Sequence, residues 1–399
     1  MAVKRVTKIL LVVSLVVLTA AVSVGLTLYL TAMPASQVDT EPVKAKMDEI
    51  GAYLEAYFID EYDPETVVAA AADGAAAAMI EATGDEWSYY ISAEEMQAHT
   101  EQMENAYVGV GVTIQMVDLG VEITDVTKGG PADGAGIRPG DIVTHVDGQS
   151  TVELGVPGTQ AVVRGEVGTD VHFTILRGKE VMELDLTRAS IMAVVAEGQM
   201  LEDKIGYVTI ANFDQHCAEQ TLACVHELLD QGAEALLFDV RFNGGGLKTE
   251  MVEILDVLLP EGPLFRSVDY AGREEVVMSD VAYLPVPMVV LVNEDSYSAA
   301  EFFAAALQEY DAAEIVGVQT TGKGNFQYTL PLSDGSAVAL SVGKYCTPNG
   351  VSLSDIGVTP DVEVNLEYED YVSLYYGTLE QAKDAQLQAA IELLLTKIS

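Results

Sequence analysis

The amino-acid sequence predicts a multidomain α/β protein in which a helical region and a glycine-rich β module precede a layered α/β domain. From residue 205 onward, short apolar strands alternate with helical patterns, the order typical of layered α/β domains. From residue 107 to about 188, short β runs separated by Gly-rich turns indicate a compact β module. Before residue 107, apolar side chains recur at helical spacing. A length of 399 residues accommodates this arrangement, since a domain usually takes about 100 to 200 residues.

Acidic residues dominate the charge of the chain. Asp and Glu number 62 against 20 Lys and Arg, so the formal net charge is −42. A surface of this charge repels a phosphate backbone, and we therefore expect no nucleic-acid partner. The hydrophobic fraction of 49% indicates a folded protein with an acidic surface, because a disordered acidic chain contains few apolar residues.

Residues 9–32 form an uncharged and largely apolar run that follows three basic residues, Lys4, Arg5 and Lys8. The run is long enough to span a bilayer and exceeds the apolar segment of about 7 to 15 residues in a cleaved signal. The basic flank is expected to stay in the cytoplasm, which places the rest of the chain outside. The sequence therefore predicts an uncleaved single-pass anchor. A cleaved signal is the alternative, although Met33 and Pro34 stand where a cleavage site needs small residues.

The patterns divide the chain into five parts. We predict a cytoplasmic flank and membrane anchor in residues 1–33, a linker and helical region in 34–106, the β module in 107–189, the α/β domain in 190–366 and a C-terminal helical segment in 367–399. Ser92 and Glu95 have the spacing of a capping box, and Pro131 is expected to open a short helix inside the β module.

The three cysteines do not predict a disulfide framework. Cys217 and Cys224 fall in one helical pattern, where seven residues span about 10.5 Å, too far for a mutual disulfide. We interpret these two and Cys346 as small buried hydrophobic residues.

The first candidate for chemistry is the turn Asn243-Gly244-Gly245-Gly246, which lies between an apolar strand and a helix. Consecutive glycines let backbone N–H groups point into a site for a phosphate or an oxyanion. The spacing does not match the dinucleotide fingerprint, because position 249 is Thr. A tight turn without a site is the alternative.

The second candidate is Ser298, which stands at the start of the predicted helix of residues 299–310. A nucleophile there benefits from the positive end of the helix dipole, and the N–H of Ala299 is free to stabilise negative charge. Ser298 and Glu301 also form S-x-x-E, so Ser298 could serve only as an N-cap.

The third candidate is Lys323, a rare base in an acidic and apolar stretch. Residues 317–323 match G-x-x-x-x-G-K and raise the possibility of a phosphate loop. Position 324 is Gly rather than Ser or Thr, and a strand pattern follows instead of a helix, which argues against that function. An exposed turn lysine is the plainer alternative.

A nucleophilic serine needs a base, and the sequence offers two kinds. None of the five histidines lies within 70 residues of Ser298, although a distant residue such as His216 can still be its partner in the fold. A lysine serves equally well if burial keeps its amine neutral. Lys323 could then accept the Ser298 proton, with Gln327 positioning the amine, provided that the pocket is dry.

Ser298, Lys323 and Gln327, together with the Asn-x-Gly-Gly turn, resemble the carboxyl-terminal processing peptidases, a family of Ser/Lys serine proteases. Further motifs of the chain follow in the order of that family: GDEWSYYISAEEM, GVGVTI, GGPADGAGIRPGDIVTHVDG, the closing LTR, IGYVTIANF, FDVRFNGGG, VLVNEDSYSAAE, TTGKGNFQ and GVSLSDIGVTPDVEV. The resemblance implies that the β module is a PDZ domain and that the α/β domain is a ClpP/crotonase-like protease core.

The resemblance assigns a role to each matching residue. Ser298 becomes the nucleophile, Lys323 the general base and Gln327 the residue that orients the lysine. The backbone N–H groups of Gly245 and Ala299 become the oxyanion hole.

Two segments depart from the family pattern. The family usually has Asn-Pro-Gly-Gly where this chain has Gly244 in place of Pro, which loosens the turn but leaves its N–H groups in place. It usually has Ser-Ala-Ser-Ala-Ser-Glu where residues 296–301 read SYSAAE. Tyr297 and Ala300 therefore affect the expected shape of the substrate subsites, whereas the assignment of Ser298 as the nucleophile is unchanged.

The resemblance also implies that the PDZ domain captures a substrate C-terminus by strand addition and gates the active site. The groups expected to hold the carboxylate are the backbone N–H groups of Val108, Gly109, Val110 and Gly111. An arginine can couple the PDZ domain of relatives to the catalytic Gln. Arg177 or Arg188 could serve here, and an ordinary surface arginine is the alternative.

The sequence thus predicts a membrane-anchored, extracytoplasmic serine endopeptidase, expected on a bacterial cell surface, that cleaves near the C-termini of proteins without metal or other cofactor. The expected partners are protein C-terminal tails and the membrane. The resemblance also implies a homodimer formed through the terminal helices, which the helical pattern of residues 379–398 permits. Three alternatives stay open: a non-catalytic PDZ adaptor with a degenerate protease core, a Ser/His hydrolase that uses His216, and a phosphate-binding protein.

Overall fold

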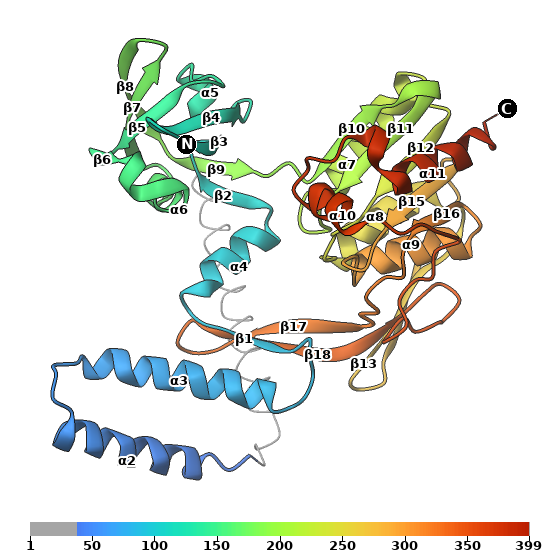
Figure 1. Ribbon diagram of the computed structural model, residues 1–399. Helices are drawn as coiled ribbons and strands as arrows, with labels where there is room; N and C mark the ends of the chain where they lie inside the picture. The colour runs from blue at the N-terminus through green and yellow to red at the C-terminus, as the bar shows by residue number, and fades with distance from the viewer. Residues whose placement is uncertain (1–37, 399) are drawn as a thin grey trace, which may run out of the picture. The chain divides into compact units, whose positions relative to one another are not determined.

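The computed structural model describes residues 38–398, which form two compact units, one ending at Ala76 and the other beginning at Ala77 (Figure 1). The predicted membrane anchor, residues 9–32, lies outside the described residues. Within the part that is described, no helix combines the length and the hydropathy needed to cross a membrane.

Two helices account for the described part of the first unit, namely α2 (Glu41–Tyr57) and most of α3 (Pro64–Glu81). Pro42 and Pro64 stand in their first turns, where the missing N–H is not needed. Neither helix contains a buried residue, and Val43, Met47 and Ile50 remain exposed. The helical prediction for this region is confirmed, although its apolar stripe stays open to solvent.

The capping box predicted for Ser92 and Glu95 is present at the start of α4 (Glu95–Met103). The Ser92 N–H donates to Glu95 Oε2 at 3.0 Å, and the Glu95 N–H donates to Ser92 Oγ at 3.3 Å. These bonds satisfy backbone donors that have no partner within a helix.

The β module contains a six-stranded sheet in the order β3-β4-β5-β7-β8, with β6 beside β5. The bounds are β3 (Val112–Val117), β4 (Gly120–Val126), β5 (Ile142–Val146), β6 (Gln149–Ser150), β7 (Asp170–Arg177) and β8 (Glu180–Thr187). Pro131 opens α5 (Pro131–Gly134), as predicted. A second helix, α6 (Thr151–Val163), is not apparent in the sequence because Gly155 and Pro157 lie inside it; Gly155 adopts φ 65° and kinks the helix.

A second six-stranded sheet lies at the centre of the α/β domain, in the order β10-β11-β12-β15-β16-β19. Strand β10 is antiparallel to its neighbour and the others run parallel. The bounds are β10 (Ala196–Met200), β11 (Ile205–Ile210), β12 (Ala235–Asp239), β15 (Met288–Val292), β16 (Ala313–Gly317) and β19 (Val362–Glu363). The connecting helices are α7 (Cys217–Asp230), α8 (Lys248–Leu258) and α9 (Ala299–Glu309), the last of which is close to the predicted range of residues 299–310.

Both faces of this sheet are covered, which explains why its strands are continuous apolar runs. Leu236 and Phe238 of β12 join the core formed with α7, α8 and α9. Ala235 and Leu237 face the other way and pack with residues of α11 (Ala385–Leu395). Part of the predicted helical pattern of residues 379–398 therefore forms a helix that becomes a layer of the α/β domain.

A third sheet carries strands beside the candidate site, in the order β1-β18-β13-β14 with β17 paired to β18. The bounds are β1 (Tyr89–Ile91), β13 (Gly262–Asp269), β14 (Glu274–Ser279), β17 (Asn325–Pro331) and β18 (Ala337–Cys346). Strand β1 lies within residues 34–106, for which the sequence predicted only a linker and helices. The Ser341 N–H donates to Ser88 Oγ at 2.9 Å, so the segment before β1 is bonded to β18 although 253 residues separate the two in the sequence.

Candidate active site

Ser298 lies at the point where the turn after β15 enters α9, as the sequence predicted. Its backbone angles, φ 59° and ψ −122°, lie outside the β region that an ordinary N-cap residue adopts. Such a conformation costs about 1 to 3 kcal/mol and is retained where the surroundings impose it, most often at functional sites. The residue is 8% exposed and lines a cleft of about 1070 Å³. The capping box that the S-x-x-E spacing predicted is present, so Ser298 begins α9 as a cap and also lines the cleft.

Glu301 is completely buried in the first turn of α9, and its hydrogen bonds connect the segments that form the site. Its carboxylate accepts four hydrogen bonds, from the Ser298 N–H at 2.9 Å, Thr320 Oγ1 at 2.6 Å, the Gly322 N–H at 2.7 Å and the Lys323 N–H at 2.8 Å. Burial raises the pKa of Glu301, and these four bonds oppose the rise by favouring the ionised form. The S-x-x-E motif identified a capping residue, but it did not reveal that the same carboxylate organises the lysine loop.

Lys323 follows β16 in the loop that leads into β17, and its side chain lines the same cleft as Ser298. Its Nζ lies 4.7 Å from the ring centroid of Trp87 and 5.6 Å from that of Tyr297. Burial lowers the pKa of Lys323, while the carboxylates of Asp85 and Glu301 act in the opposite direction. The partly buried environment that a neutral amine requires is present, and so is the opposing negative charge.

Gln327 also lines the cleft, but its amide is engaged elsewhere. Its Nε2 donates to the backbone oxygen of Asn325 at 3.2 Å and to Ser341 Oγ at 3.1 Å. The rings of Trp87 and Tyr297 lie within 6 Å of the Lys323 amine. Gln327 is thus placed in the site without orienting the lysine in this structure.

The predicted oxyanion donors, Gly245 and Ala299, lie next to each other. A Cβ added at Gly245 would fall 2.7 Å from Ser298 Cβ and 2.9 Å from the Ala299 nitrogen, and Gly245 has φ 90°. The position therefore requires glycine both for its backbone angle and for space. The Gly245 N–H donates to Asn243 Oδ1 at 2.8 Å, so this bond must be exchanged before Gly245 can hold an oxyanion.

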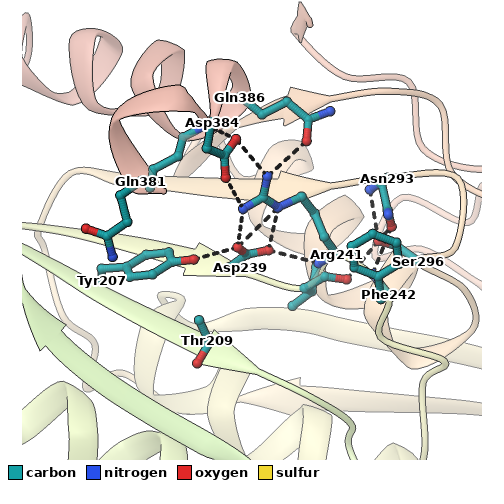
Figure 2. Close-up of polar contacts among 12 residues, drawn as sticks. Tyr207, Thr209, Asp239, Arg241, Phe242, Asn293, Ser296, Gln381, Asp384 and Gln386 are labelled. Carbon is teal, nitrogen blue, oxygen red and sulfur yellow. Dashed lines mark hydrogen bonds and ion pairs between the residues drawn. The ribbon is translucent and has the colours of Figure 1, made fainter. Parts of the chain in front are cut away.

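A buried polar network supports the end of β12 directly before this turn (Figure 2). The Arg241 guanidinium lies 2.6 Å from Asp239 Oδ2 and 2.8 Å from Asp384 Oδ2, and it donates to Gln386 Oε1 at 3.0 Å. Tyr207 also donates to Asp239, at 2.7 Å.

Phe242 follows Arg241 with φ 60°, unusual for a bulky residue, and it connects the network to the turn. Its N–H donates to Asn293 Oδ1 at 2.9 Å, and its ring packs edge-on against Tyr371 and Tyr375 of α10 (Tyr368–Tyr375). Contacts far apart in sequence therefore hold the backbone from which the glycine turn begins.

The β module has its own groove of about 270 Å³. Of the four residues expected to hold a substrate carboxylate, Gly109, Val110 and Gly111 line this groove and Val108 does not. Val108 and Gly109 both belong to the strand β2 (Ala106–Gly109), which pairs with β9 (Ala189–Met192). The groove also contains Arg164, which the sequence analysis did not single out.

The arginines predicted to couple the PDZ module to the active site are bonded within the module. Arg177 makes two bonds of 2.7 Å to Asp141, and its bonds to Asp141 raise the pKa of Arg177. Arg188 is buried and donates to the carbonyls of Val162 and Val163 at the end of α6. Arg164 is instead the arginine of the groove, and it pairs with Glu101 of α4 at 3.3 Å.

The two other site predictions find less support in the geometry. His216 lies 3.8 Å from Glu219 on α7 and is not among the residues that line the Ser298 cleft. In the G-x-x-x-x-G-K segment, the N–H groups of Gly322 and Lys323 both donate to Glu301, so they are not free for a phosphate. The strand β17 follows the segment, as expected from its sequence.

The three cysteines are not joined in disulfides, and Cys217 is buried, which raises the pKa of its thiol to about 12. Cys224 and Cys346 are only partly buried. Among residues 38–398, no group of three or more His, Cys, Asp or Glu side chains is arranged to hold a metal ion.

Comparison with known proteins gives matches over most of the chain. The model of Peptidase family S41 matches residues 204–364, and that of the PDZ domain matches residues 122–177. The carboxy-terminal processing protease CtpA of Bacillus subtilis (strain 168) is 30% identical over 370 residues, which are 91% of this chain and 78% of that protein. A probable CtpA-like serine protease of Staphylococcus haemolyticus (strain JCSC1435) is 29% identical over 89% of this chain and 72% of its own length. Among solved structures, a photosystem II D1 C-terminal processing protease is 28% identical, covering 80% of this chain and 86% of its own, with a TM-score of 0.46.

Proposed function

The chain belongs to the S41 family of serine peptidases as a CtpA-like C-terminal processing protease with a PDZ domain, and we propose that Ser298 and Lys323 perform its peptide-bond cleavage. The observation that carries this proposal is the position of Glu301. Its Oε2 accepts the N–H of Ser298 at 2.9 Å and the N–H of Lys323 at 2.8 Å. One oxygen that binds both backbones keeps the nucleophile and the base at the same end of the cleft.

The reaction proceeds through an acyl-enzyme. Ser298 Oγ attacks the carbonyl carbon of the scissile bond while the neutral Lys323 amine accepts its proton. The resulting ammonium donates that proton to the leaving amine, and the peptide bond breaks. Water then attacks the ester at Ser298, losing a proton to Lys323, and releases the new C-terminus as the serine regains its proton.

The negative charge that develops on the substrate oxygen is held by the N–H groups of Gly245 and Ala299. Ala299 lies in the first turn of α9, where N–H groups lack helical partners and the helix dipole is positive. Gly245 contributes once its bond to Asn243 Oδ1 is exchanged for the substrate oxygen. Gln327 orients the lysine in the working state after leaving Asn325 and Ser341.

The PDZ module binds the C-terminal tail of the substrate and gates the active site. Its groove presents the backbone of residues 109–111 next to apolar side chains such as Val163 and Phe173. This combination suits an extended peptide that adds a strand and inserts an apolar C-terminal side chain.

The enzyme acts outside the cytoplasm while anchored in the cell membrane of a bacterium. Residues 9–32 and the basic residues before them support this proposal by sequence alone. A second copy of the chain is a further proposed partner.

The proposed function is tested on the full-length protein in detergent, with a protein substrate that ends in an apolar tail. Ser298→Ala and Lys323→Ala should each abolish cleavage, while His216→Ala should retain it. A fluorophosphonate should label the wild-type protein at Ser298 and leave Ser298→Ala unlabelled. Full activity of Lys323→Ala would eliminate the dyad, and absence of both labelling and cleavage in the wild type would favour a non-catalytic adaptor.

A further inference from the structure

The Lys323 amine lies beside two aromatic rings that come from separate parts of the chain. Trp87 precedes β1, and Tyr297 precedes the candidate nucleophile. Their ring centroids are 5.9 Å apart, and Lys323 Nζ lies within 6 Å of both. All three side chains line the cleft and are partly buried.

The position of the Tyr297 ring depends on the glycine at position 244. A Cβ added at Gly244 would fall 2.6 Å from the Tyr297 hydroxyl oxygen and 2.8 Å from the carbon that bears it. Any side chain at position 244 would therefore displace the ring. Gly244, which has no side chain, therefore leaves the space that the Tyr297 ring occupies. Gly244 and Tyr297 stand in the two segments that depart from the family pattern.

The arrangement has an electrostatic consequence. The face of an aromatic ring carries partial negative charge and attracts a cation within about 6 Å of its centre. The attraction exists for the ammonium and is lost for the neutral amine. The rings therefore favour the protonated form of Lys323, even though they also shield it from water.

We propose that Trp87 and Tyr297 are positioning residues that hold the Lys323 side chain as an ammonium ion against their rings in the substrate-free enzyme. This inference rests on the proposed function in that it makes the two rings a restraint on the general base. The amine becomes a base only when the ammonium loses its proton, and leaving the rings makes that loss easier because the cation–π attraction no longer favours the ammonium.

Other charged groups contribute to the same equilibrium. Asp85, in the loop before β1, and Glu301 of α9 act on Lys323 directly. Further ionisable side chains line the cleft, among them Glu86, His99, Lys248, Asp269 and Glu275. All of them stay unchanged in the variants below, so that a difference between variants reports on the rings.

The test separates the charge distribution of the rings from their bulk. Trp87→Met and Tyr297→Met keep an apolar side chain of substantial volume but remove the ring, whereas Trp87→Phe and Tyr297→Phe keep a ring. Each change is made in the Ser298→Ala protein, and the acetylation rate of Lys323 with acetic anhydride is followed against pH by mass spectrometry. This measures the pKa of the amine without any catalysis.

We expect each Met variant to lower the pKa of Lys323 by about 0.5 to 1 unit, because a cation–π contact of this kind favours the ammonium by that amount. The Phe variants should change it by less than half as much. Equal values in the Met and Phe variants, or a higher pKa in the Met variants, would overturn the inference. Circular dichroism identifies a variant that fails to fold. If the variants at one of the two ring positions do not fold, those at the other position provide the test.

A second measurement keeps the inference distinguishable from the proposed function. With Ser298 restored, the pH dependence of kcat/KM is recorded for the same variants. If Lys323 is the general base, the acidic limb moves to lower pH by the amount found in the labelling. A shift in labelling without a shift in kcat/KM would support the aromatic restraint and contradict the assignment of Lys323 as the base.

Discussion

Arg241 and Asp384 form a buried ion pair of 2.8 Å although 143 residues separate them in the sequence. Asp384 also accepts the Leu387 N–H at 3.0 Å and thereby caps the N-terminus of α11. The C-terminal helix is thus joined to the strand end that leads into the glycine turn of the active site. A carboxylate far from Ser298 contributes in this way to the backbone that supports it.

Asp384→Ala should destabilise the protein by roughly 3 to 5 kcal/mol, because it leaves part of the Arg241 charge buried without its partner and removes a helix cap. The free energy of unfolding from urea titration measures this effect. Glu380→Ala, which removes an exposed pair with Lys383 at 2.9 Å, is the control and should cost less than about 1 kcal/mol. Equal losses in the two variants would show that the buried pair has no special role.

Glu301→Gln should lower kcat/KM by about 100-fold or more. The amide nitrogen that replaces one carboxylate oxygen cannot accept hydrogen bonds, so the bonds to that oxygen are lost. The lysine loop then shifts relative to Ser298. Glu309→Gln is the matched control, since Glu309 accepts the Asn349 N–H at 2.8 Å from the other end of the same helix. Kinetics with the tailed substrate measure both variants. An active Glu301→Gln enzyme would contradict the proposed organising role.

Gly245→Ala should reduce kcat/KM by about 100-fold or more. The added methyl group would lie 2.7 Å from Ser298 Cβ, and a φ of 90° is strained for alanine. Gly134→Ala, where a Cβ meets nothing within 4 Å, is the control. Reaction with a fluorophosphonate provides an independent measure of Ser298, and normal labelling of Gly245→Ala would argue against the predicted crowding.

Asp214 should make the stability of the protein depend on pH. Burial and the nearby charge of Glu250 raise its pKa to about 7 in the folded protein, whereas an unfolded Asp ionises near pH 4. The folded state retains the proton between these values, so this contribution to stability is complete below about pH 4 and is lost as the pH rises through 7.

Asp214→Asn should remove this dependence. Relative to the variant, the wild-type free energy of unfolding should fall by roughly 2 to 4 kcal/mol between pH 4 and pH 8. Urea titrations across this range measure the difference. Asp118→Asn, the control, changes an exposed carboxyl of the PDZ module and should show the same pH dependence of the free energy of unfolding as the wild type. If the free energy of unfolding of Asp214→Asn depended on pH as it does in the wild type, this dependence could not be assigned to Asp214.

The sequence by itself determined the order of the elements and the types of residue available for chemistry. Apolar periodicity identified the buried strands and helices of the protease core, since burial on one or both faces leaves a local pattern. Ser298 at the start of α9 and Lys323 in a glycine-flanked loop were recognisable because their signals lie within a few residues. The resemblance then joined these local signals into one site.

Only the tertiary structure decided what surrounds those residues. That Glu301 binds both loops, that Trp87 contacts Lys323, and that Asp384 pairs with Arg241 are contacts between distant segments, which leave no local periodicity. Helix α6 was missed for the opposite reason, because the local preferences of Gly155 and Pro157 oppose a helix that packing stabilises. Local chemistry predicts which groups are present, whereas their state of protonation and their orientation depend on neighbours that the fold alone brings together.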